Sequence, residues 1–187
     1  MTNTKPRRLL WLATALAVLV LSAAGCSGGD SAASSAPTDS YAQSLYNSRV
    51  QYIGDNAAVG SLLSQLGVDN RMGAFTMELQ TKDKPYGLTL HFEQSPEDAT
   101  AFSDQFQYYG NLLLALIDNC GQVSCTFPTS ESSASHTMTW TAEDAHTSLD
   151  TDVKACGGSA EGVAALLGTI RTVYRDNPNI QAFYQDT

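Results

Sequence analysis

The chain has 187 residues, 43% of them hydrophobic, and carries 19 acidic against 10 basic side chains. Three basic residues, Lys5, Arg7 and Arg8, precede an apolar run as in an export signal, and their removal would leave a formal charge of −12. So acidic a chain offers no basic patch to phosphates, which argues against nucleic acid or a polyanionic envelope polymer as a partner. The negative charge permits a cationic peptide or a divalent ion as a partner. A solvated acidic surface with no partner is the simpler explanation.

The amino-terminal segment has the layout of a lipoprotein signal. Its apolar run, residues 9–21, is about 13 residues long, whereas a stable membrane span needs roughly 20. Small residues then lead to Cys26 in a pattern that resembles the bacterial lipobox, although Ala23 stands where leucine is favoured. We therefore expect a signal peptide over residues 1–25 and two acyl chains, palmitate among them, on Cys26. An ordinary secretory signal and an uncleaved anchor are the alternatives.

The remainder is expected to form a tether and one domain on the extracytoplasmic face of the cell membrane. After Cys26, residues up to 40 include no large apolar side chain, so the segment 26–40 cannot bury a core and should be flexible. Residues 41–187 are enough for a single domain that buries roughly two-thirds of its unfolded surface.

Three further cysteines follow, Cys120, Cys125 and Cys156. Disulfides persist outside the cytoplasm, and an odd number of cysteines leaves one thiol unpaired. A tight turn at Gly121 would allow a Cys120–Cys125 disulfide, and Cys156 paired with either of them is the rival arrangement. No second Cys-x-x-Cys and no adjacent histidine supports zinc, so we expect no metal site.

Apolar residues at intervals of three and four predict helices, and local capping signals mark their ends. The expected helices run from Asp55 to Gly67, from Ser95 to Ile117, from the Thr141–Asp144 capping box onward, and from Ser159 to just before Pro178. Ser95 is the expected cap of the long helix. Gly110 would bend or split that helix.

Period-two alternation predicts strands over residues 75–80, 88–93, 123–127 and 137–141. Residues 82–85 should form a hairpin loop between the first two of them. Four half-buried strands with helices between and after them imply an α+β domain in two layers. We expect a roughly four-stranded, largely antiparallel sheet with helices packed on one face.

Three motifs resemble one bacterial family, Domain of Unknown Function 4825. They read YIGDNAAVG at 52–60, LQT at 79–81 with PYGL at 85–88, and ALIDN at 115–119. Members of the family share the layout of an anchor, a linker and an extracytoplasmic domain, and a similar domain is attached to membrane metallopeptidases that resemble antibiotic sensors. The resemblance therefore implies sensing or partner binding, while it brings no established activity.

The polar and aromatic members of these motifs have two interpretations. In the first they are structural: Gly54 supplies a positive-φ turn, Asp55 or Asn56 caps a helix, and Asn119 ends one in left-handed geometry. In the second they gather at one end of the sheet as a recognition site with Tyr52 and Tyr86 as aromatic walls. The recognition-site interpretation requires the three motifs to lie at the same end of the domain. Its candidate residues are Tyr52, Gly54, Asp55, Asn56, Gln80, Pro85, Tyr86, Asp118 and Asn119.

No catalytic motif stands out in the chain. There is no Gly-x-Ser-x-Gly motif and no Gly-rich phosphate loop after a strand. The three histidines, His91, His136 and His146, are far apart in sequence, and residues 150–152 lack the EF-hand pattern. We therefore name no catalytic residue and expect no cofactor.

The leading hypothesis is a membrane-anchored, non-catalytic module that binds or senses a peptide, an envelope component or a membrane partner. The alternatives are an envelope hydrolase with an unrecognised site and a structural accessory subunit of a membrane complex. A deep pocket with converging histidine or acidic side chains would favour the hydrolase. An exposed apolar groove or a bare strand edge would favour binding.

The anchor can be tested at Cys26. The Cys26→Ala variant should lose its acyl chains and leave the membrane fraction, because the cysteine sulfur carries the lipid. Mass spectrometry of the mature amino terminus checks this. A mature chain that starts at another residue and carries no lipid would contradict the assignment.

Overall fold

The computed structural model describes residues 39–129, 134–181 and 183, so the signal, Cys26 and the tether up to residue 38 lie outside the described residues. The strands are β1 (Phe75–Gln80), β2 (Gly87–Phe92), β3 (Gln122–Pro128) and β4 (Ser135–Thr141). The helices are α1 (Ser40–Asn47), α2 (Asn56–Leu66), α3 (Val68–Met72), α4 (Ala99–Leu116), α5 (Ala142–Leu149), α6 (Val153–Cys156), α7 (Ala160–Val173) and α8 (Pro178–Gln181).

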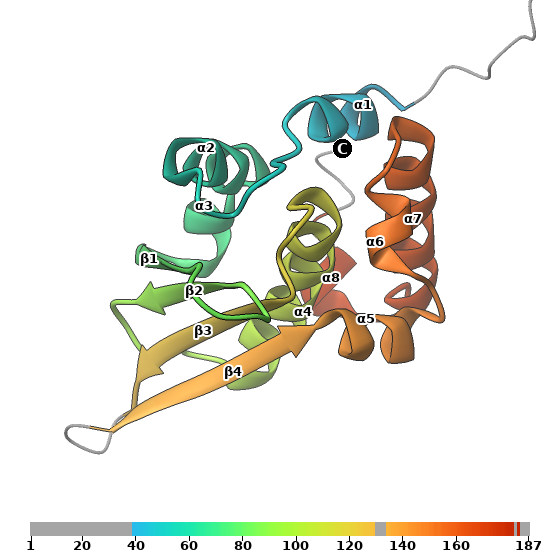
Figure 1. The fold of residues 1–187 in the computed structure, drawn as a ribbon. Coiled ribbons are helices and arrows are strands. Elements are labelled where there is room, and N and C mark those ends of the chain that lie inside the picture. Colours follow the sequence, from blue (N-terminus) through green and yellow to red (C-terminus); the bar gives the residue numbers. More distant parts are fainter. Residues whose placement is uncertain (1–38, 130–133, 182, 184–187) are drawn as a thin grey trace, which may run out of the picture. The chain divides into compact units, whose positions relative to one another are not determined.

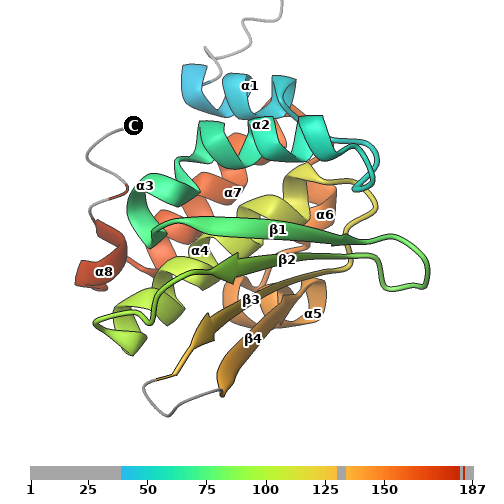
Figure 2. The same ribbon diagram turned by 90° about the vertical axis from the view of Figure 1, so that its left-hand side faces the viewer.

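The four strands form one open sheet in the order β1-β2-β3-β4 (Figure 1). The β1–β2 and β3–β4 pairs are antiparallel, and the β2–β3 pair is parallel. A parallel pair needs a crossover connection, and α4 supplies it. Figure 2 looks onto the sheet with α4, α6 and α7 behind it. The expected α+β fold, a largely antiparallel four-stranded sheet with helices, is confirmed.

The two faces of the sheet differ in polarity because side chains alternate along each strand. The register aligns an apolar row on the helix side, consisting of Leu79, Leu88, Val123 and Trp140. The neighbouring row on the opposite side is polar and consists of Glu78, Thr89, Ser124 and Thr139. The polar rows face away from the helices, so this side of the sheet needs no covering layer.

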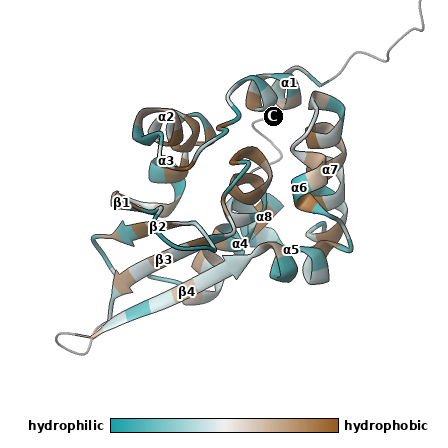
Figure 3. Cartoon of the chain, in the orientation of Figure 1, coloured by the Kyte–Doolittle hydropathy of each residue, from teal (hydrophilic) through white to brown (hydrophobic). Residues whose placement is uncertain are grey.

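Helix α4 is the centre of the core, and Figure 3 shows its apolar character. All residues from Tyr108 to Leu116 are buried. The predicted cap at Ser95 is wrong, because Asp98 accepts hydrogen bonds from the Thr100 and Ala101 amides at 2.8 and 3.0 Å. A carboxylate that reaches two free amides makes charge-assisted bonds. Ser95 instead donates to the carbonyl of Pro128.

Gly110 neither splits nor interrupts α4, which is a single helix. A Cβ atom at Gly110 would lie 2.7 Å from Cδ1 of Trp140. The indole also donates from Nε1 to Oδ1 of the fully buried Asn111 at 2.9 Å. The glycine therefore serves the close packing of β4 against α4.

The other predicted helices form where expected. Asp55 caps α2, which ends at Gly67 with φ of 67°, and Thr141 and Asp144 form the capping box of α5. Ser159 caps α7. The sequence patterns did not predict α1, α3, α6 and α8, which have at most eight residues each. Among the described residues, no helix is long and apolar enough to cross a membrane.

The close packing of Gly157, which follows α6, against α4 gives a prediction about stability. A Cβ atom at Gly157 would lie 1.8 Å from the carbonyl oxygen of Ala115, so Gly157→Ala must push the backbone of α4 aside. We expect it to reduce the free energy of unfolding by about 3 kcal/mol. The control is Gly168→Ala on the exposed side of α7, where nothing lies within 4 Å and a gain of up to about 1 kcal/mol is expected. Equal urea midpoints for the two variants would contradict the packing.

Candidate functional site

The three motifs come together at the end of the sheet where β1 passes into β2. We call this the hairpin end, formed by residues 50–56, 81–86 and 117–121. A Cβ atom at Gly54 would lie 3.6 Å from Cγ2 of Thr81, and one at Gly121 would lie 2.8 Å from Cβ of Pro85. Figure 2 shows the three segments at one end of the sheet. The geometric requirement of a common recognition site is therefore met.

The α4–β3 connection, residues 117–121, ties the three segments together by backbone hydrogen bonds. The amide of Val50 donates to the carbonyl of Leu116 at 2.8 Å, and the amide of Asp118 donates to the carbonyl of Val50 at 2.9 Å. At its other end, the amide of Gly121 donates to the carbonyl of Tyr86 at 2.8 Å. These bonds hold the loop before α2 and the β1–β2 hairpin to the same segment.

The side chain of Asn119 makes a direct hydrogen bond to the loop before α2. Its side-chain Oδ1 accepts a hydrogen bond from the amide of Ile53 at 2.7 Å. The predicted left-handed geometry of Asn119 is wrong. Among the described residues, Asp150 is the only non-glycine residue with a positive φ. Helix α4 ends in extended geometry at Ile117, and the Asn119 side chain serves another segment instead of its own helix.

The predicted positive-φ turn at Gly54 is also wrong. Among the described residues, the glycines with positive φ are Gly67 and Gly73. A Cβ atom at Gly54 would make only an ordinary contact with Thr81, and nothing in the structure explains a glycine there. The alternative structural role of Asp55 is confirmed, because its carboxylate accepts from the Ala58 amide at 3.0 Å.

Two cations that the sequence patterns did not predict bind residues 117 and 118, which directly follow α4. Nζ of Lys154 donates to the carbonyls of Ile117 and Asp118 at 2.8 and 3.4 Å. Burial lowers the pKa of Lys154, while the nearby carboxylates of Asp118 and Asp152 oppose that shift. Nε of Arg49 lies 3.3 Å from Oδ1 of Asp118. Both cations lie outside the motifs, and no local pattern marks them.

The hairpin end presents an open hollow of about 550 Å³. Its lining residues are Lys84, Pro85, Tyr86, Asn119 and Gly121. Nζ of Lys84 lies 5.9 Å from the centre of the Tyr86 ring, within the range of a cation–π contact. Tyr52 does not line this hollow but belongs to the same end of the domain, where its side chain is 69% exposed. Gln80 and Asp118 are exposed as well.

The cysteines do not pair. Cys120, Cys125 and Cys156 are free thiols, so the expected Cys120–Cys125 disulfide is absent from the structure. Cys125 lies three residues into the extended strand β3, so the tight turn that would return the chain to Cys120 does not form. Burial raises the pKa of Cys125 to about 12 and raises that of Cys120 as well, so both thiols are poor nucleophiles.

A histidine lies in a hydrogen-bonded row on the open face of the sheet. Nδ1 of His91 is 2.7 Å from Oγ1 of Thr126, and its Nε2 is 3.1 Å from Oε2 of Glu78. The order hydroxyl, imidazole and carboxylate is that of a hydrolase triad. However, the side chains of His91 and Glu78 are 39% and 70% exposed, whereas oxyanion stabilisation is effective in a site closed to water. The row therefore does not favour the hydrolase.

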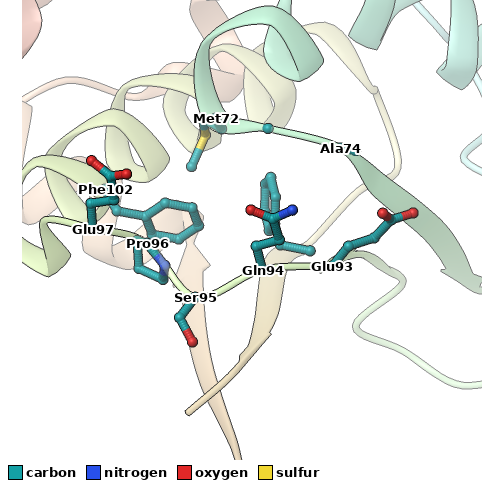
Figure 4. A pocket seen from close by; sticks show the side chains of 10 residues that line it. Met72, Ala74, Glu93, Gln94, Ser95, Pro96, Glu97 and Phe102 are labelled. Atoms are coloured by element: carbon teal, nitrogen blue, oxygen red, sulfur yellow. The ribbon is translucent and has the colours of Figure 1, made fainter. Parts of the chain in front are cut away.

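A second hollow of about 260 Å³ lies beyond the opposite end of β2 and is shown in Figure 4. Half of its ten lining residues belong to the segment 93–97, and Glu93 and Glu97 lie on opposite sides of it. In the described part of the chain, no group of three or more His, Cys, Asp or Glu side chains is placed to hold a metal ion.

Fold and site together define a mixed α+β domain with one open sheet, one polar sheet face and a convergent loop surface. The chain belongs to the family described as Domain of unknown function (DUF4825), whose model matches residues 45–139, more than half of the chain. The match begins within α1 and ends within β4, so it contains every residue of the candidate recognition site. Comparisons with curated proteins and with solved structures gave no match.

The Asn119 contact can be tested by a pair of substitutions. Asn119→Leu leaves the Ile53 amide without its acceptor and should lower the free energy of unfolding by about 1–2 kcal/mol. Asn119→Asp keeps an acceptor oxygen in place and should lose less. Urea unfolding measures both variants. A loss for aspartate as large as that for leucine would show that the hydrogen bond is not the source of the effect.

Proposed function

We propose that this protein is a lipid-anchored, extracytoplasmic binding module whose hairpin end recognises a peptide or protein of the cell envelope. The observation that carries the proposal is the convergence of three motifs, separated by 18 and 26 residues in sequence, on one surface with an apolar hollow. Convergence of this kind is expected of a recognition surface.

The exposed side chain of Tyr52 supports binding more than packing. Tyr52 is one of two large hydrophobic side chains that are exposed in the described chain, the other being Val173. Tyrosine is enriched among the residues that dominate binding energy, because it combines contact area with a hydroxyl. Tyr52 is exposed at the same end of the domain as the hollow that Tyr86 lines, so both tyrosines can contact one partner.

The hydrogen bonds beneath this surface support the same function. Because Asn119 and the α4–β3 connection fix the loop before α2, the surface is formed before a partner arrives. A preformed surface loses less conformational entropy on binding, so more of the contact energy contributes to affinity.

The anchor is the second half of the proposal. A lipid on Cys26 and a tether of about a dozen residues would keep the domain close to the membrane, where the effective concentration of an envelope partner is raised. The acidic character of the exported chain would favour a partner with basic groups.

Crosslinking in membranes tests the hairpin end. A photo-crosslinker on the unaltered full-length protein should capture an envelope component, and the Tyr52→Ala, Tyr86→Ala double variant should reduce its recovery at least tenfold, since about 1.4 kcal/mol of lost binding energy suffices for that. The control is Val173→Ala, which removes apolar surface from α7. Recovery that is equal for the double variant and the unaltered protein would contradict the proposal.

A further inference from the structure

Strand β1 is an edge of the sheet, and an apolar groove runs beside it. The groove has a volume of about 390 Å³ and separates β1 from α2 and α3. Its lining residues are Gly60, Leu63, Ser64, Asp69, Ala74, Phe75 and Met77. Figure 2 shows β1 running alongside α2.

The outer backbone groups of β1 are unpaired. The amide of Glu93 donates to the carbonyl of Ala74, which makes this a hydrogen-bonded pair just beyond the β1–β2 ladder. Hydrogen-bonded and non-bonded pairs alternate in an antiparallel ladder, so Phe75, Met77 and Leu79 direct their N–H and C=O groups away from β2. The hydrogen bonds found within the described residues include no partner for these six groups.

Native edge strands are commonly protected by charged side chains, especially lysine, by proline or by a bulge; β1 has no lysine, proline or bulge, and Glu78 is its one charged residue. Its side chains Phe75, Met77 and Leu79 are only half-buried, although they pack against the core. An edge strand with unpaired backbone groups and half-buried apolar side chains is the kind of surface to which an extended peptide adds a strand.

Gly60 keeps the groove open. A glycine within a helix costs about 1 kcal/mol relative to alanine, and a Cβ atom here would meet only Cε of Met77 at 3.6 Å, an ordinary contact. Packing of the domain therefore does not demand glycine at this position. The missing side chain instead leaves room between α2 and β1.

We propose that an extended, positively charged peptide with alternating apolar side chains binds beside β1 as a fifth strand. Its backbone pairs with the outer groups of Phe75, Met77 and Leu79, and its apolar side chains enter the groove. Asp69 is the one charged residue that lines the groove, and the whole chain carries −9, so basic groups on the peptide are favoured. This site is separate from the hairpin-end hollow and does not depend on it.

Two other occupants fit the groove less well. The segment after Cys26, residues 27–38, has no large apolar side chain to place between α2 and β1. A second copy of the chain would bring its own α2 alongside its own β1, and both helices would compete for the space beside the paired edges.

The probe is an acetylated and amidated peptide, Lys-Leu-Thr-Leu-Thr-Leu-Lys, and its binding to the full-length protein in detergent is measured by fluorescence anisotropy. Gly60→Leu fills the groove and should weaken binding at least tenfold. Gly60→Ala, the matched control, should bind within about twofold of the unaltered protein. Equal affinity of the leucine variant and the unaltered protein would overturn the proposal.

Backbone pairing is tested with the unaltered protein, independently of any folding defect in a variant. Two peptides are compared, one methylated at the leucine amides and one at the threonine amides. Only alternate amides of an added strand face β1, so one peptide should lose binding at least tenfold and the other should keep it. Equal affinities of the two methylated peptides would overturn the proposal. Self-association of the full chain without peptide binding would also overturn it and would assign the edge to a second copy.

Discussion

The α4–β3 connection is the constraint on which the hairpin end depends. Helix α4 is buried along its second half and cannot shift without disturbing the core, so its exit at Ile117 fixes where the following residues lie. From that fixed position, Asn119 holds Ile53, and Gly121 holds Tyr86. A buried helix thus determines the geometry of an exposed surface.

The carboxyl end of α4 is neutralised by groups from distant parts of the chain. Lys154 approaches from α6, and Arg49 approaches from the segment after α1, where its guanidinium also lies 5.2 Å from the ring of Tyr46. Cations near the last carbonyls of a helix are favourable, because these carbonyls have no partner within the helix. Lys154, which lies after the family match, therefore supports a surface that lies within it.

Much of the fold is predictable because its signals are local. The alternation along β1 and β2 and the caps at Asp55 and Ser159 depend on neighbouring residues alone, and these elements form as expected. The cap of α4 is missed because two local signals compete and only one carboxylate reaches two free amides. Gly110 is misread because its reason is Trp140, 30 positions away, and a long-range contact has no local pattern.

The candidate site shows the same division. The residues that form its surface are found through their motifs, whereas Lys154 and Arg49 are not, because they contribute by tertiary position alone. The β1 groove is missed for a related reason: strand order decides which strand is an edge, and that order cannot be read from alternation. The absent disulfide likewise follows from the extension of β3, which spacing between cysteines does not reveal.

The central claim is that the hairpin end is held as one unit by the α4–β3 connection. Native-state hydrogen exchange of the Ile53 and Gly121 amides tests it most directly, because both amides donate to groups that tie separate segments together. Both should exchange with opening free energies close to that of the β2–β3 ladder, within about 1 kcal/mol of each other. An Ile53 amide that exchanges at the rate of an unprotected loop, while Gly121 stays protected, would contradict the account.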